Sequence, residues 1–447
     1  MAKSIIIIGS GMGGLAAGVY GQINGYETQI FEMATKPGGQ CTSWKRKGYT
    51  FDSCIHHFFG CKPGSRVYQM WHELGALPRE LVNVEECTAI ASPDGKMFVD
   101  YYDLERLKNT LLKLSPADSK MIEQYIGAIK AFANDKIGEA MDSGSFWKMI
   151  TIFPLMLPIR KWIKMNMRTF AERFSDPFLK KAFAQLVYSN PDGPLFFHFM
   201  RHVGGMNGDI QWPVGGAAEF AKSIERRYLA LGGKVHYGSR VEKILVENDK
   251  AIGIKLADGS EHRADIIISN ADGRKTILSM LDGKYINETV RGYCVPNSDE
   301  APFAVNVCLG INRDLSAEPS SLVLLLDRPM TIANHKHECI EAQFYGFDKS
   351  MAPAGKGTIK VELSASYAYW KQLYNDDREK YKQEKQKVAE QVIEILESHF
   401  HGIKSQVEVI DVSTLMTWER YMGGTQGWFN LPNQKLDFTM KEELSDK

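Results

Sequence analysis

Five residues near the start of the chain have the types and spacing needed to hold the diphosphate of a dinucleotide. They follow four consecutive isoleucines at 5–8, a run that favours a parallel strand buried on both faces. The first glycine allows a tight turn, the second lets the backbone approach the diphosphate, and the last lets a helix lie close to the strand. The charge would rest at the amino end of that helix, where free amides and the helix dipole favour an anion. These residues are Gly9, Gly11, Met12, Gly13 and Gly14.

An acidic residue follows at the separation where a carboxylate can bind ribose. Residues 27–31 indicate a second strand, and Glu32 comes directly after it, eighteen residues beyond Gly14. In dinucleotide-binding folds a carboxylate at this place accepts hydrogen bonds from ribose hydroxyls and would repel a ribose phosphate. The strand, turn, helix and Glu32 together predict a dinucleotide site and disfavour NADP.

A second glycine pair indicates which dinucleotide is bound. Gly38, Gly39 and Gln40 come soon after Glu32, and the chain then passes through an extended segment at 48–52. In plain nicotinamide dehydrogenases the chain normally turns directly into its next helix. Because two glycines let another backbone segment approach the same nucleotide, the pair favours FAD. An ordinary turn at Pro37 is the alternative interpretation.

Five motifs follow one another along most of the chain: the N-terminal glycine turn, Gly38-Gly39, Phe51-Asp52, Trp-Pro-Val-Gly-Gly at 212–216, and Ser-Asn-Ala-Asp at 269–272. In this order they resemble the phytoene desaturase superfamily of FAD-dependent oxidoreductases, which includes carotenoid desaturases, carotenoid isomerases and retinol saturases. The resemblance implies an α/β fold with a Rossmann-like, glutathione-reductase-like FAD-binding domain and an inserted α+β substrate domain. Its motifs specify the superfamily and the cofactor well and the substrate poorly.

The resemblance also assigns cofactor contacts. It implies that the glycine turn and Met12 wrap the diphosphate, that Glu32 binds the adenosine ribose, and that Val241 contacts the adenine through its backbone. Gly38, Gly39 and Gln40 would line the nucleotide and approach the flavin. Relatives often have arginine where this chain has Gln40, and they end with a glycine-rich flavin motif that is missing before Lys447. We therefore expect this 447-residue chain to bind FAD weakly.

The order of predicted elements indicates two interleaved domains. We expect residues 1–75 and 205–280 to form a discontinuous FAD-binding domain, and residues 76–204 and 281–447 to form the substrate domain. A helix is predicted from Gly216 to about Leu231, then a β-meander whose last strand rejoins the nucleotide-binding sheet. The strands of this meander are predicted at 234–237, 240–247, 251–256 and 261–269. The substrate domain is predicted to have a mostly helical part at 104–200, strands at 303–311, 321–326, 339–347 and 358–366, and a helix at 377–400.

Composition restricts the partners. The 447 residues carry a formal net charge of +0, which does not support nucleic-acid binding. Seven cysteines without a Cys-x-x-Cys pair argue against a secreted disulfide framework, so we expect a reducing, cytoplasmic location. No metal site is expected, since the cysteines and histidines at 54–61 and 335–339 fit no common ligand spacing.

One segment has the composition of a membrane-surface element. Residues 146–159 are mostly apolar, and residues 160–168 carry a cluster of lysines and arginines. Such a pairing suits peripheral contact with a membrane, although a pair of core helices would give a similar pattern. No apolar run reaches the length of about 20 residues that a spanning helix needs.

The predicted chemistry belongs mainly to the flavin, with the protein supplying binding, orientation and exclusion of water. We expect a hydrophobic small-molecule substrate and, because no second nucleotide motif is present, a diffusing electron acceptor or donor. No catalytic residue is assigned; His56 and His57 are candidates without a role. The leading hypothesis is an FAD-dependent desaturase or saturase of an isoprenoid or other lipid. The alternatives are a flavin-dependent polyene isomerase or amine-oxidase-like enzyme, and a non-catalytic flavin- or lipid-binding protein.

Overall fold

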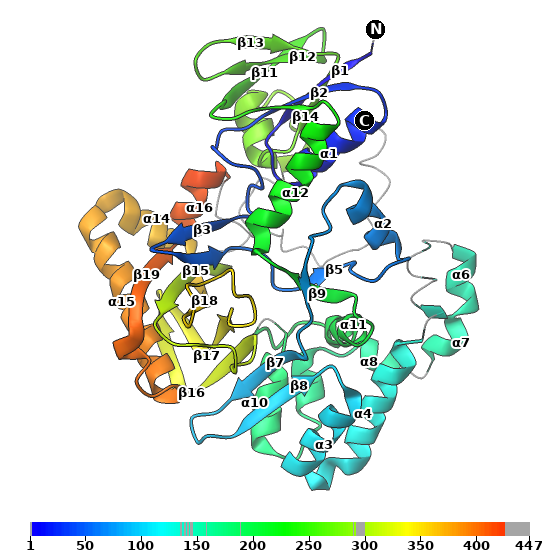
Figure 1. Ribbon diagram of the computed structural model, residues 1–447, viewed down its shortest axis with the longest axis vertical. Helices are drawn as coiled ribbons and strands as arrows, with labels where there is room; N and C mark the ends of the chain where they lie inside the picture. The colour runs from blue at the N-terminus through cyan, green and yellow to red at the C-terminus, as the bar shows by residue number, and fades with distance from the viewer. Residues whose placement is uncertain are drawn as a thin grey trace.

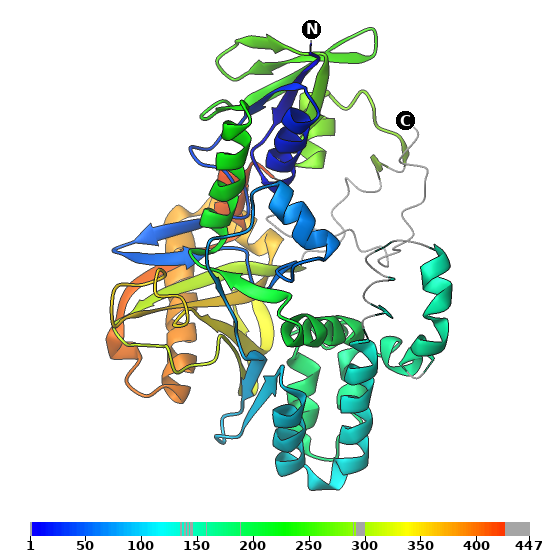
Figure 2. The same ribbon diagram turned by 45° about the vertical axis from the view of Figure 1, so that its right-hand side comes forward.

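The computed structural model describes residues 2–134, 136–137, 140, 143, 146–157, 159–187, 189–288, 290–291 and 300–424. The molecule is elongated, with a parallel sheet and its helices at one end and a larger sheet and a helical region at the other (Figures 1 and 2). Within the described residues, no helix is both long and apolar enough to cross a lipid bilayer.

A four-stranded parallel sheet occupies the N-terminal end, with strand order β10-β2-β1-β14. The four isoleucines of β1 are nearly inaccessible because α1 and other elements cover both faces of this central strand. The predicted strands, the helix near Met12 and the return of a late strand to this sheet are confirmed. The elements are β1 (Ser4–Ile8), α1 (Met12–Ile23), β2 (Glu27–Phe31), α12 (Gly216–Ala230), β10 (Lys234–His236) and β14 (Ile266–Ser269).

The predicted four-strand meander is wrong in two respects. Its first strand, β10, pairs with β2 in the parallel sheet, so the meander has only three strands, β11-β12-β13. Its last strand is two strands, because the chain leaves β13 before Asp265. The Asp265 carboxylate accepts hydrogen bonds from the Ser4 amide and hydroxyl at 2.8 and 2.9 Å, which fixes the start of β14 beside β1. The meander strands are β11 (Val241–Glu247), β12 (Lys250–Leu256) and β13 (Glu261–Arg263).

A seven-stranded mixed sheet forms the centre of the second region, in the order β19-β15-β18-β17-β16-β7-β8. Helices α14 and α15 pack against it and bury a core of aliphatic side chains and Trp370 (Figure 1). Four strands and α15 lie where the sequence predicted them, whereas β7, β8 and β19 were not predicted. The elements are β7 (Glu86–Ala91), β8 (Met97–Tyr101), β15 (Glu300–Ile311), β16 (Ser321–Ile332), β17 (His335–Phe344), β18 (Gly357–Ser366), α14 (Tyr367–Asp376), α15 (Arg378–His399), η3 (Lys404–Gln406) and β19 (Val407–Ser413).

The middle of the chain is helical, as predicted. Its aromatic side chains stack on one another in a closed core, with Phe174 and Phe183 only 4.4 Å apart between ring centroids. This packing favours a structural role for the aromatic residues over a substrate tunnel at this place. The helices are α3 (Leu104–Leu114), η1 (Pro116–Asp118), α4 (Ser119–Phe132), α6 (Phe146–Thr151), α7 (Phe153–Met156), α8 (Arg160–Ile163), α9 (Met167–Ala171), α10 (Pro177–Gln185) and α11 (Leu195–Met206).

Short elements connect the two regions. A hairpin, β3-β4, follows the glycine pair, and a small sheet of order β5-β9-β6 leads toward α12. The hairpin carries the predicted extended segment at 48–52 across to the seven-stranded sheet, where β4 packs against β18. These elements are β3 (Ser43–Arg46), β4 (Tyr49–Asp52), β5 (Phe58–Phe59), α2 (Arg66–Glu73), β6 (Leu81–Val82) and β9 (Ile210–Pro213).

Candidate cofactor site

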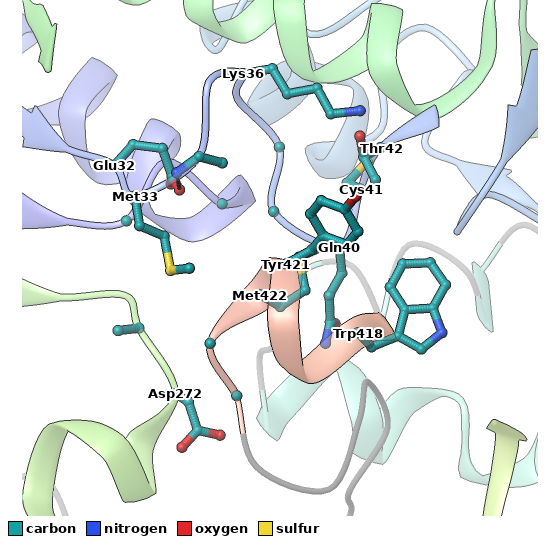
Figure 3. A pocket seen from close by; sticks show the side chains of 18 of the residues that line it. Glu32, Met33, Lys36, Gln40, Cys41, Thr42, Asp272, Trp418, Tyr421 and Met422 are labelled. Atoms are coloured by element: carbon teal, nitrogen blue, oxygen red, sulfur yellow. Dashed lines mark hydrogen bonds between the residues drawn. The ribbon is translucent and has the colours of Figure 1, made fainter. Parts of the chain in front are cut away.

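A large cavity lies between the carboxyl end of β1, the first loop after β2 and the helix α16 (Leu415–Met422) (Figure 3). Its volume is about 920 Å³, in the upper part of the range of roughly 300–1,000 Å³ that small-molecule and cofactor sites have. Nine of the ten residues predicted to bind the cofactor line this cavity, and the tenth, Gly14, lies buried behind it. The nine are Gly9, Gly11, Met12, Gly13, Glu32, Gly38, Gly39, Gln40 and Val241.

The glycine turn has the geometry that the sequence predicted. Gly9 has φ +94°, a left-handed conformation that other residues adopt only with strain. A Cβ on Gly14 would stand 2.0 Å from the Gly9 carbonyl oxygen, so only glycine lets α1 approach the turn this closely. Gly11 caps α1 without any side-chain hydrogen bond. The amino end of α1 is therefore open to an anion in the cavity.

Glu32 lies at the cavity wall, but part of its carboxylate is already used. Its Oε2 accepts hydrogen bonds from the Ser10 amide at 2.7 Å and the Ser10 hydroxyl at 2.8 Å, and its Oε1 accepts one from the Ala34 amide at 2.7 Å. A carboxylate has about four acceptor positions, so at least one stays available for a ribose hydroxyl. The three bonds hold the carboxylate in a single orientation.

The second glycine pair lies against the first turn, and both line the same cavity. Gly38 forms a parallel bridge with Gly11 and donates its amide to the Ser10 carbonyl at 2.9 Å. A Cβ on Gly39 would stand 3.3 Å from the Gly11 Cα. Two backbone segments thus meet at one wall of the cavity, and Gln40 extends from the second segment toward Trp418 of α16 (Figure 3).

A family model of flavin containing amine oxidoreductases matches residues 12–276, more than half of the chain. The chain belongs to this family. FAD is its cofactor, and the open helix end, the close backbone approach and the size of the cavity fit such a dinucleotide. The predicted superfamily, cofactor and enzyme class are thereby confirmed.

Individual relatives agree with this assignment. The chain is 25% identical to a chloroplastic prolycopene isomerase of Daucus carota, over 95% of this chain and 71% of that protein. It is 25% identical to a neurosporene-forming phytoene desaturase of Rhodobacter capsulatus, over 62% of this chain and 54% of that protein. The solved structure of an oxidoreductase from Methanosarcina mazei matches with a TM-score of 0.63 at 20% identity, covering 92% of this chain and 88% of that one. The predicted fold class is confirmed.

Several residues that line the FAD cavity were not predicted as cofactor contacts. Asn270 packs against the glycine turn, since a Cβ on Gly13 would stand 2.6 Å from its Oδ1. Helix α16 closes the cavity from the side of the seven-stranded sheet, although we expected residues 281–447 to serve the substrate domain alone. The signal for α16 was present: Thr414 and Thr417 form a capping box, and Gly423 ends the helix at φ +68°. The expected polar tail at 440–447 lies outside the described residues.

The Phe51-Asp52 and Trp-Pro-Val-Gly-Gly motifs meet each other. The Asp52 carboxylate accepts hydrogen bonds from the amides of Cys54 and Ile55, both at 3.1 Å, and from the Ala217 amide at 2.6 Å. Asp52 is fully buried. Its hydrogen bond from the Ala217 amide lies at the amino end of α12, where a negative charge is favourable. A Cβ on Gly216 would stand 2.3 Å from Asp52 Oδ2, which explains the second glycine of that motif.

A buried ionic network lies beside Asp52, on β17, β18 and the loop after β4. Lys360, with no exposed side-chain surface, lies 3.3 Å from Glu362 Oε1, and His56 Nε2 lies 3.0 Å from Glu362 Oε2. Burial acts to raise the pKa of Glu362, but His56 and Lys360 outweigh it and lower this pKa to about 2. His56 also contacts Gln343, whose Oε1 accepts from the Tyr345 hydroxyl at 2.7 Å. His56 therefore lies in direct contact with Glu362, which the sequence did not predict.

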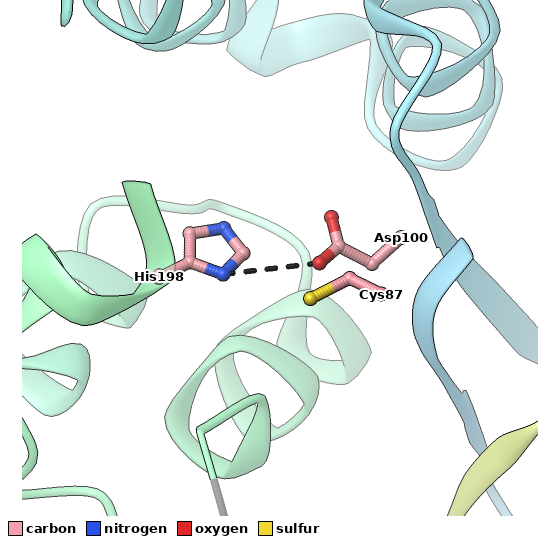
Figure 4. Close-up of side chains that lie close together, drawn as sticks. All are labelled: Cys87, Asp100 and His198. Carbon is pink, nitrogen blue, oxygen red and sulfur yellow. Dashed lines mark ion pairs between the residues drawn. The ribbon is translucent and has the colours of Figure 1, made fainter. Parts of the chain in front are cut away.

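A separate polar cluster is enclosed between β7, β8 and α11. Cys87, Asp100 and His198 each have one atom that could bind a metal ion, and these three atoms lie within 4.8 Å of one another (Figure 4). The Asp100 carboxylate lies 2.9 Å from His202 Nε2 and 3.8 Å from His198 Nδ1. Burial acts to raise the pKa of Asp100, but these two histidines lower it, while burial lowers the pKa of His198 to about 3. None of these residues lines the cavity between α1 and α16.

The segment at 146–168, predicted as either a membrane contact or core, contains both exposed and buried apolar side chains. Trp147 is 75% exposed and Phe153 63% exposed on α6 and α7, whereas Trp162 of α8 is 2% exposed and belongs to the core. Ile150 and Leu157 add to the exposed apolar face. Helices α6 and α7 lie at the outer edge of the molecule in both views (Figures 1 and 2).

Proposed function

We propose that this flavoprotein acts on carbon–carbon bonds of a hydrophobic isoprenoid or other lipid, transferring electrons between that substrate and a diffusing partner. The observation that carries the proposal is the glycine-lined FAD cavity in a chain whose relatives are carotenoid desaturases and isomerases over much of its length. An apolar substrate also agrees with the exposed apolar face on α6 and α7.

Different residues of the chain would bind different parts of FAD. The amino end of α1, at Gly11 and Met12, would hold the diphosphate, and Glu32 would orient the adenosine ribose. Val241, 5% exposed beside the cavity, would contact the adenine. FAD, when bound, supplies the acceptance or donation of a hydride equivalent. Gly38, Gly39 and Gln40 would position the remainder of the cofactor and exclude water from it.

Anaerobic spectroscopy tests the proposal. The FAD-loaded chain would be mixed without oxygen with a panel of polyenes, including phytoene and retinol, and the flavin absorbance would be followed. A desaturase is expected to bleach the oxidised flavin as a substrate double bond forms, and a saturase to re-oxidise flavin that was reduced beforehand. If no member of the panel changes the flavin spectrum or is itself converted, the redox assignment is wrong.

A flavin-dependent polyene isomerase is the second candidate, because four prolycopene isomerases each match at least 95% of this chain. An isomerase returns its electrons to the same molecule, so product would accumulate without stoichiometric consumption of an acceptor. Chromatography of cis and trans polyenes, with acceptor consumption measured in the same sample, separates this candidate from the first.

We also propose that the exposed face of α6 and α7 contacts an anionic lipid surface. Arg160, Lys161 and Lys164 are exposed just beyond that face, so apolar side chains and positive charges lie together as interfacial binding requires. Wild-type protein should sediment with phosphatidylglycerol vesicles more than with phosphatidylcholine vesicles. The double variant Trp147→Ser/Phe153→Ser should lose most of this binding, and Leu229→Ser on α12 should keep it. Self-association that the double variant abolishes, without vesicle binding, would instead show a protein interface.

A further inference from the structure

Two cysteines lie opposite each other at the wall of the FAD cavity. Strands β3 and β4 pair Ser43 with Asp52, and the Ser53 amide then donates to the Thr42 carbonyl at 3.0 Å. Cys41 and Cys54 come next along the two segments, just beyond the last paired residues of the hairpin. Both residues line the cavity, the Cys41 thiol donates to the Ala217 carbonyl at 3.7 Å, and each of the two thiols shifts the pKa of the other.

The cross-strand position suits a disulfide bond. Directly opposed residues of an antiparallel pair have Cα atoms about 4.5–5.5 Å apart, and a disulfide needs a Cα separation of roughly 4.4–6.8 Å. Both sulfurs are uncombined in this structure.

The surroundings make one of the two thiols reactive. The hydrogen bond from Cys41 lowers the pKa of Cys54, and the charge of buried Lys360 lowers it further, against burial and the charge of Asp52. Burial instead raises the pKa of Cys61 and of Cys87 to about 12. Since the thiolate is the attacking species in thiol–disulfide exchange, Cys54 is the expected nucleophile and Cys41 the resolving thiol.

We propose that Cys41 and Cys54 form a redox-active dithiol–disulfide pair facing the FAD cavity. On oxidation two S–H bonds break, one S–S bond forms, and two electrons and two protons pass to a two-electron acceptor. Oxidised flavin is such an acceptor in the enzyme, and a small-molecule disulfide is one in solution. The pair gives external thiols a route for exchanging electrons with the cavity, in a chain without a second nucleotide motif. The role of the flavin as acceptor rests on the proposed function; the chemistry of the pair does not.

The test equilibrates the full chain, without added FAD, in glutathione buffers of graded potential. Maleimide labelling of the unfolded protein then counts free thiols, and peptide mass spectrometry locates any disulfide. Wild type and Cys308→Ser, whose buried residue lies outside the cavity, should each lose two thiols reversibly, with the bond between Cys41 and Cys54. Cys54→Ser should lose none. Cys41→Ser should instead form a mixed disulfide of glutathione with Cys54.

A second measurement uses the FAD-loaded chain and follows flavin absorbance without oxygen during addition of dithiothreitol. Reduction of the flavin should be at least tenfold slower in Cys54→Ser than in wild type. If wild type keeps both thiols at every potential, or if Cys54→Ser forms the same disulfide count, the proposal is overturned whatever the substrate proves to be. A disulfide that forms without any effect on flavin reduction would overturn the flavin as acceptor.

Discussion

The cofactor cavity and the buried ionic network lie close together but are assembled in different ways. One wall of the cavity is built from two short stretches, 9–14 and 32–40, whose glycines shape the backbone and whose Glu32 supplies a carboxylate. The network joins His56 to Lys360 and Glu362, residues about 300 positions apart in the chain. Local backbone conformation explains this wall of the cavity, whereas only the complete fold brings the charges of the network together. The two regions should therefore respond differently to substitution.

The largest effect is expected in the network, from Lys360→Met. This change leaves the Glu362 and Asp52 carboxylates without their buried cation, and breaking a buried ion pair costs about 3–5 kcal/mol. The free energy of unfolding, measured with urea, should fall by that amount. The double variant Lys360→Met/Glu362→Leu should recover part of the loss, because it removes one of the stranded charges. A single variant as stable as wild type would show that Lys360 is not the compensating charge.

Acid should next destabilise the polar cluster around His198 and the buried ionic network. The pKa of His198 is about 3 in the folded chain against 6.5 in its ordinary state, so below about pH 6.5 only the unfolded chain binds this proton. The pKa of Glu362 is about 2 against 4.5, so its contribution is fully present above pH 4.5 and is lost as the pH falls toward 2. Each group gives a slope of up to about 1.4 kcal/mol per pH unit. The unfolding free energy should fall as the pH is lowered from about 7 to 4. An unfolding free energy that does not change over this range would contradict the burial of His198.

The contact between the two regions can be weakened at Asp52. In Asp52→Asn the charge that meets three backbone amides is lost, and one amide hydrogen of the new side chain must face a donor. Loss of a charged hydrogen-bonding group at a buried site costs about 1–3 kcal/mol. Thermal unfolding should show this loss, together with faster hydrogen exchange at the start of α12. Unchanged exchange there would mean that Asp52 does not hold this helix end.

The smallest effect is expected in the cavity, from Glu32→Gln. The amide keeps one acceptor but loses the charge, which should weaken FAD binding by about three- to tenfold, the equivalent of roughly 0.7–1.4 kcal/mol. Flavin fluorescence titration measures this change. Glu27→Gln, at an exposed position on the strand that precedes Glu32, is the matched control and should bind FAD as wild type does. Equal weakening of both variants would argue against a specific ribose contact.

The features that could be predicted from the sequence are the local ones, and those that could not are contacts between residues far apart in the chain. The glycine turn, the strands at 5–8 and 27–31 and the approach of a second glycine segment to the nucleotide site could be predicted because each is specified by a short stretch of sequence. The ion pair of His56 with Glu362 could not, since no local pattern specifies which strands of a mixed sheet become neighbours. The position of β10 was missed for a similar reason: a short alternating segment fits either sheet, and only the register with β2 decides.

The most direct test of the whole account is an FAD titration of wild type against Gly11→Val. Gly11 has φ −62°, which valine tolerates, and its Cβ would lie 3.0 Å from Asn270 Nδ2. A small shift of the Asn270 side chain should let the variant fold, with added bulk at the amino end of α1. Circular dichroism and thermal unfolding would verify that both proteins are folded. Wild type should bind FAD, and Gly11→Val should bind it at least a hundredfold more weakly. Equal affinity in the two folded proteins would mean that the cofactor does not lie against the amino end of α1.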